Sequence, residues 1–137
     1  VSDTLLNKNS VLPKMTVYKS PTCGCCTSWV EHMQKSGFNV SVVETDDLNS
    51  IKNKLAVPTE LASCHTAKVG NYFIEGHVPA DDVKRLIQEN SNARGIGVPG
   101  MPLGSPGMEV PSGDVQPYTV TQGSKDGSLS IFSSHSK

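Results

Sequence analysis

Three of the four cysteines of this 137-residue chain stand together, in Cys23-Gly24-Cys25-Cys26, between a β-prone run and a helical pattern. The run Met15–Tyr18 is rich in β-branched and aromatic residues, which favours a short strand. The apolar residues after the cysteines recur at helical spacing and predict one buried helix face, formed by Trp29, Val30 and Met33. The cysteines are therefore expected at the N-terminus of that helix, where unpaired amide groups and the helix dipole stabilise thiolates.

A second strand and a second helix follow. Asn39–Val43 reads as the strand, and Asp46 or Asp47 can cap the helix, which ends before Pro58. The apolar positions of this helix are Leu48, Ile51 and Leu55. A β-α-β-α order with cysteines at the start of the first helix is typical of a thioredoxin-like α/β fold, in which helices flank a central mixed β-sheet.

The next segment predicts a β-hairpin and a third helix. Ala67–Val69 and Tyr72–Ile74 flank the turn dipeptide Gly70-Asn71, and we expect this hairpin to be an inserted segment. Pro79 suits the first turn of a helix. The apolar positions of that helix are Val83, Leu86 and Ile87.

Composition then changes. Residues 95–117 hold 11 of the 21 Gly and Pro residues (12 Gly and 9 Pro), so we expect a loop without helix or long strand. Tyr118–Thr121 and Leu129–Phe132 predict a final hairpin. The expected organisation is a flexible arm over residues 1–13, one domain over residues 14–132 and a frayed tail over residues 133–137.

Charge and hydropathy exclude several classes of protein. Twelve Lys and Arg against thirteen Asp and Glu give a net charge of −1, which argues against binding to nucleic acid or an anionic membrane. No apolar run approaches the roughly 18–20 residues that span a bilayer. The chain starts at Val1 without an apolar leader, as expected of a secreted protein whose signal peptide has been removed.

The third clustered cysteine bears on the chemistry. A thiol–disulfide oxidoreductase needs only Cys23 as nucleophile and Cys26 as resolving thiol, so Cys25 is surplus to it. A soft cation uses the extra thiolate, and Cu(I) accepts two or three sulfur donors that can bridge neighbouring ions. A structural zinc module, completed by Cys64 or His65, is a third possibility. We favour the soft-metal site and keep the other two as alternatives.

Cys64 is the fourth cysteine and lies in the polar segment Ser63–Thr66, unlike a core strand. We expect it to be the fourth ligand, or the partner of another cysteine when oxidised. The ring of His65 is expected to bond a neighbouring carbonyl, His77 to serve structure, and His32 to face solvent. Two loop methionines, Met101 and Met108, offer soft thioethers and are expected to pack over the cysteines or to contact the metal.

Four ordered blocks together resemble the CopG copper-resistance family. They are Tyr18–Cys26, Ser63–Ala67, Glu75–Pro79 and Val98–Glu109. The resemblance implies a periplasmic protein of thioredoxin-like build that binds copper through Cys23, Cys25, Cys26 and Cys64. It further implies several Cu(I) ions bridged by thiolates, a copper or thiol redox role, and other periplasmic copper-handling proteins as partners. The region of Pro99 or Pro102 would correspond to a cis-proline loop that faces the cysteines, with Met101 near the site.

Overall fold

The structure of the protein is a computed structural model that describes residues 12–89, 93–100 and 102–135. Most of the expected N-terminal arm, residues 1–11, thus lies outside the described residues. In chain order the elements are β1 (Met15–Lys19), α2 (Gly24–Lys35), β2 (Val40–Glu44), α3 (Leu48–Lys54), the 3-10 turn η1 (Thr59–Leu61), β3 (His65–Val69), β4 (Tyr72–Gly76), α4 (Ala80–Glu89), β5 (Ala93–Val98), β6 (Tyr118–Ser124) and β7 (Leu129–His135).

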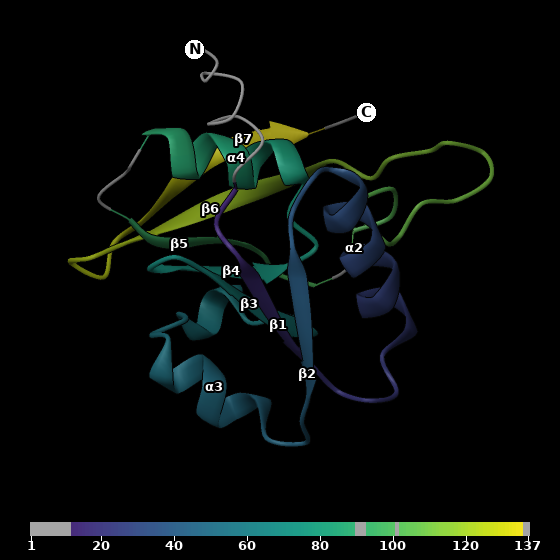
Figure 1. Ribbon diagram of the computed structural model, residues 1–137. Helices are drawn as coiled ribbons and strands as arrows, with labels where there is room; N and C mark the ends of the chain where they lie inside the picture. Colours follow the sequence, from purple (N-terminus) through teal and green to yellow (C-terminus); the bar gives the residue numbers. More distant parts are fainter. Residues whose placement is uncertain (1–11, 90–92, 101, 136–137) are drawn as a thin grey trace, which may run out of the picture.

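The strands form one mixed sheet in the order β2-β1-β3-β4-β5-β6-β7 (Figure 1). β1 is parallel to β2 and antiparallel to β3, and β4 is antiparallel to β3. This is the expected thioredoxin-like order, with α2 joining the two parallel strands. The β3–β4 hairpin, which we expected as an insertion, instead forms the middle of the sheet because β3 pairs directly with β1.

Helices cover both faces of the sheet. Trp29 and Met33 of α2 and Val83 of α4 belong to the main core cluster. Side chains alternate between the faces of a strand, and Thr66 and Glu75, which are register partners in β3 and β4, point to the other face, where Lys52 of α3 contacts them. Figure 1 accordingly shows α3 apart from α2 and α4. The sheet thus separates a hydrophobic core from a polar buried cluster.

Residues 95–98, which we expected in a loop, form strand β5 instead. β5 is parallel to β4, and Gly95 lies opposite Phe73. A Cβ atom at Gly95 would lie 2.1 Å from the Phe73 carbonyl oxygen and 2.5 Å from the Phe73 ring. Glycine is therefore required here by close packing and does not mark a turn.

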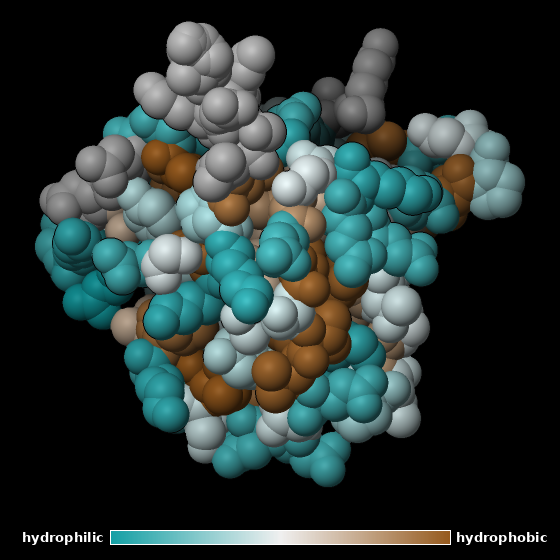
Figure 2. All heavy atoms as spheres, in the orientation of Figure 1, coloured by the Kyte–Doolittle hydropathy of each residue, from teal (hydrophilic) through white to brown (hydrophobic). Residues whose placement is uncertain are grey.

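Both edge strands of the sheet expose apolar side chains, and on β7 these are Leu129 and Ile131, which is 73% exposed. On β2, Val42 and Val43 are each 43% exposed, and apolar residues gather over this part of the face in Figure 2. At the other edge, β7 continues to His135 through the segment that we expected to fray from Ser133, because Ser133, Ser134 and His135 pair with β6. The His135 Nε2 atom also lies 2.7 Å from Asp82 Oδ2 of α4. Residues 136–137 lie outside the described residues. No helix in the described part of the chain is both long and apolar enough to cross a membrane.

Candidate metal centre

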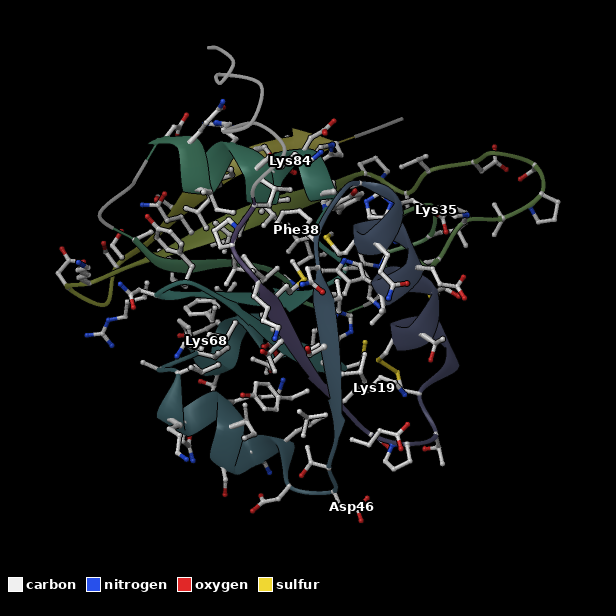
Figure 3. The ribbon with its side chains drawn as sticks, in the orientation of Figure 1. Lys19, Lys35, Phe38, Asp46, Lys68 and Lys84 are labelled. Carbon is white, nitrogen blue, oxygen red and sulfur yellow. A yellow bond between two sulfur atoms is a disulfide. The ribbon has the colours of Figure 1, made fainter. Side chains whose placement is uncertain are left out.

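The cysteine cluster sits at the N-terminus of α2, as expected. Cys23 is the N-cap residue and has an extended backbone, and Cys26 lies in the first turn, fully buried. The two form a disulfide with a Cα–Cα distance of 5.4 Å, which Figure 3 shows as a yellow bond at the start of the helix. Cys25 and Cys64 are each partly buried and are not part of this disulfide. The structure therefore shows the oxidised state of the Cys23–Cys26 pair.

The sheet brings Cys64 to the three clustered cysteines. β3 runs antiparallel to β1, so His65 lies opposite Lys19, where β1 ends and the chain turns toward α2. The sulfur atoms of all four cysteines lie within 4.8 Å of one another. The Cys23 and Cys25 sulfurs are 3.6 Å apart, and the Cys26 sulfur is 3.7 Å from the Cys64 carbonyl oxygen. Two stretches that are distant in sequence thus supply one group of soft donors.

Two histidines adjoin this group. His77 Nε2 lies 3.2 Å and His65 Nδ1 lies 3.4 Å from the Cys64 sulfur, and His65 Nδ1 is also 3.3 Å from the Cys26 sulfur. Both rings are fully buried. The ligand atoms of Cys64, His65 and His77 also lie within 4.8 Å of one another. Cys64 therefore belongs to a sulfur group and to a mixed sulfur–nitrogen group.

The Gly/Pro-rich loop orients His77. Its Nδ1 donates a hydrogen bond to the Pro106 carbonyl oxygen at 2.7 Å, which leaves a lone pair on Nε2 of the neutral ring. Gly107 has φ +92°, and a Cβ there would lie 2.8 Å from the Cys25 carbonyl oxygen and 3.0 Å from His77 Nδ1. The loop can cover the site this closely only because residue 107 is glycine.

Burial shapes the protonation of the site. It is the main cause that raises the pKa of the Cys64 thiol to about 11, a value that includes a smaller contribution from the neighbouring Cys25. Burial lowers the pKa of His65 to about 3, with a contribution from His77, and it also lowers the pKa of His77 itself. In the metal-free protein, Cys64 is therefore a neutral thiol, and the imidazoles of His65 and His77 beside it are also neutral. A cation that displaced the thiol proton would remove the cost of burying the thiolate.

A buried polar cluster fixes the backbone before Cys64. The Glu75 carboxylate accepts hydrogen bonds from the Ser63 amide at 2.7 Å and the Thr66 hydroxyl at 2.5 Å, and it forms an ion pair with Lys52. The Ser63 hydroxyl donates to the Gly100 carbonyl oxygen at 2.8 Å. Glu75 thereby positions the residue that precedes the thiol, a role that no local sequence pattern indicates.

Several expectations for single residues need correction. His77 does more than the structural role we assigned, since its Nε2 faces the Cys64 sulfur. For His65, the expected contact with a neighbouring carbonyl is made with the Gly76 backbone, which favours the protonated ring, although Nε2 meets no acceptor among the described residues at full hydrogen-bonding geometry. His32 is half-buried instead of exposed, and its Nε2 accepts a hydrogen bond from the Ala80 amide at the start of α4.

The Gly/Pro-rich loop differs in part from what we expected. The described residues contain no cis peptide bond, so a cis-proline at Pro99 is not found. The part of the loop that packs against Cys25 and His77 is Pro106-Gly107. Met101 lies outside the described residues. Met108 is half-buried, and its backbone closes a turn with Gly104 and Ser105, so its contact with a metal stays a prediction.

The metal-free protein is expected to lose stability in acid because of His65. An unfolded histidine binds its proton near pH 6.5, whereas folded His65 binds it only near pH 3. Between these values the unfolded state holds the extra proton. The contribution of His65 to the free energy of unfolding should therefore have its full value above pH 6.5. Below that pH the free energy of unfolding should fall by about 1.4 kcal/mol per pH unit. Urea unfolding of the chelator-treated protein between pH 7 and pH 5 measures this slope.

His65→Phe should flatten that pH dependence, and His135→Gln serves as the matched control that should retain it. Parallel pH profiles for the His65 variant and the unmodified protein would contradict the assignment.

Comparison with known proteins gives a consistent result. A family model described as a protein of unknown function, DUF411, matches residues 61–108. Two solved structures of the copper resistance protein CopG, form 1 and form 2, are similar to this chain at 35% and 36% sequence identity, each with a TM-score of 0.86. The similarity covers 93% of this chain and 100% of form 1, and 91% of this chain and 99% of form 2. No curated protein sequence matches the chain.

Proposed function

This chain belongs to the CopG copper-resistance family, and on that premise we propose that its four cysteines bind Cu(I) when all of them are reduced. The observation that carries the proposal is the convergence of Cys23, Cys25, Cys26 and Cys64, whose sulfurs lie within 4.8 Å of one another. Soft thiolates select Cu(I). Four sulfurs this close can share bridging positions, so the pocket suits more than one ion.

The disulfide makes loading dependent on reduction. Opening the Cys23–Cys26 bond takes two electrons and two protons from a dithiol or a similar reductant and yields two thiols. Each thiol then loses its proton as it binds copper. We propose that the protein works in the periplasm, where it sequesters copper, passes it to another copper-handling protein, or changes its oxidation state.

Cys25 provides the test of this proposal. Anaerobic titration of the fully reduced protein with Cu(I), against a competing chelator, should show several ions per chain. Cys25→Ser should lower the affinity by more than about tenfold, because it removes a thiolate from the group. Ser28→Ala, on the exposed side of the same helix, should leave binding unchanged. Equal binding by Cys25→Ser and the unmodified protein would contradict the proposal.

The disulfide also favours a second candidate function, thiol–disulfide exchange. Cys23 is partly exposed and Cys26 is fully buried, which suits an attacking thiol and a resolving thiol. In this reading, reduced Cys23 attacks a substrate disulfide, and Cys26 displaces the mixed disulfide to leave a reduced substrate and the bond seen here. An insulin-reduction assay distinguishes the functions, since Cys25→Ser should retain this activity while losing copper.

A further inference from the structure

We propose that Cys64, His65 and His77 form a second, mononuclear metal site, which holds one copper ion while the Cys23–Cys26 disulfide is closed. The disulfide removes two of the four thiolates from the sulfur group. It leaves the sulfur–nitrogen group intact, with its three ligand atoms within 4.8 Å of one another. The identity of the metal rests on the proposed function, whereas the existence of the site rests on the geometry alone.

The spacing of the three ligand atoms fits one ion. A metal about 2.3 Å from a thiolate and about 2.05 Å from an imidazole nitrogen places those two donors about 3.6 Å apart at a tetrahedral angle. The Cys64 sulfur lies 3.2 Å from His77 Nε2 and 3.4 Å from His65 Nδ1. Both sulfur–nitrogen separations therefore lie within a few tenths of an ångström of the value that one ion would require, and the two nitrogens lie within 4.8 Å of each other.

His77 is oriented as a metal ligand. A ligating histidine usually donates its second ring N–H to a carbonyl or carboxylate, which fixes the tautomer and the ring plane. His77 does this through Nδ1 to the Pro106 carbonyl oxygen at 2.7 Å. The bare Nε2 then points at the Cys64 sulfur, and Gly107 holds the loop against the ring.

His65 distinguishes a metal site from a simple thiol–imidazole hydrogen bond. Such a bond would account for the contact between Cys64 and His77. It does not account for a second, fully buried imidazole whose Nδ1 faces the same sulfur and whose ring also interacts with the Gly76 backbone. The Trp29 ring, with its centroid 4.5 Å away, packs on His65 and limits its rotation. Two imidazoles directed at one thiol are the donor set of His2Cys copper sites.

The test uses Cys25→Ser with the disulfide closed, so that Cys64 supplies the one remaining thiol. The probe is Cu(I), which is diamagnetic, added anaerobically to protein labelled with ¹⁵N in its histidines. We expect one equivalent to bind and the ¹⁵N resonances of His77 Nε2 and His65 Nδ1 to shift. The resonances of His32 and His135, which face other groups, should not move.

Variants give an independent readout. His77→Gln and His65→Gln, each in the Cys25→Ser background, should weaken Cu(I) binding by at least about tenfold, and His135→Gln should not. The NMR measurement keeps the proposal falsifiable if either variant folds poorly. Copper that binds without shifting the two imidazole resonances would overturn the proposal.

The two proposals can fail separately. Copper binding that occurs only after the disulfide is reduced would overturn the second site and leave the four-cysteine site standing. The opposite result is that the oxidised protein binds one equivalent with both imidazole resonances shifted and takes up no further copper on reduction. It would overturn the four-cysteine site and leave the second site standing.

Discussion

Replacing Glu75 with alanine should lower the free energy of unfolding by about 3–5 kcal/mol. The side chain is fully buried and pairs with Lys52, whose side chain is itself only 12% exposed. Its removal leaves a largely buried ammonium group without its counter-ion, and it deprives the Ser63 amide and the Thr66 hydroxyl of their acceptor. Unpaired buried charges and donors are among the most costly defects in a folded protein. Urea or guanidinium unfolding measures the loss.

An exposed ion pair provides the control for this prediction. Arg85 and Glu89 of α4 stand one turn apart, and each side chain is 48% exposed. Glu89→Ala should therefore cost no more than about 0.5 kcal/mol. If Glu75→Ala lowered the free energy of unfolding as little as Glu89→Ala, the buried cluster around Glu75 would not stabilise the fold as we propose.

Gly76→Ala should destabilise the fold by about 3 kcal/mol or more and also weaken copper binding. Gly76 has φ +76°, which is unfavourable for an L-residue. The added Cβ would lie 2.4 Å from the Val98 carbonyl oxygen and 2.7 Å from the Ser63 hydroxyl. Because one of these atoms belongs to the backbone of β5, relief requires strands to move. Displacement of Ser63 would carry Cys64 away from its partners.

Gly70→Ala separates the two causes. Gly70 also has positive φ, +58°, but its added Cβ would meet nothing within 4 Å. It should therefore show only the backbone penalty, about 1–2 kcal/mol, with copper affinity unchanged. Thermal unfolding and Cu(I) competition on both variants provide the comparison. Equal losses in the two variants would show that the contacts of Gly76 with β5 and Ser63 are unimportant.

The sequence was most informative where the signals were local. The alternation of β1, the spacing of Trp29 and Met33 and the cap at Asp47 are each contained within a few residues, and the structure confirms the elements that they predict. The unusual density of cysteines in one turn pointed to the site in the same way. Cys64 could be added to the predicted site because it is the one other cysteine in the sequence.

The contributions of His77 and Glu75 escaped prediction because they depend on distant partners. Nothing around His77 indicates that a proline carbonyl 29 residues later fixes its tautomer. Similarly, the sequence around Glu75 shows only a charged residue in a β-hairpin. Its partner, Lys52, belongs to a separate helix that packs on this face of β3 and β4. β5 was missed for a related reason, since glycine looks like a turn signal in isolation and becomes a packing requirement only beside Phe73.

The loop between β5 and β6 has two parts with opposite tolerance to change. Its ends are fixed by neighbouring paired strands, with Gly97 opposite Thr121, and Ser105 is fully buried where the near part packs on the site. The far part, around residues 110–113, is mostly exposed and projects from the body of the protein (Figure 1), whereas Gln116 bonds back to Leu103 of the near part. Lengthening or trimming this outer arc should cost little closure entropy. A fluorophore or affinity tag could therefore be grafted there to report on copper loading without disturbing the ligands.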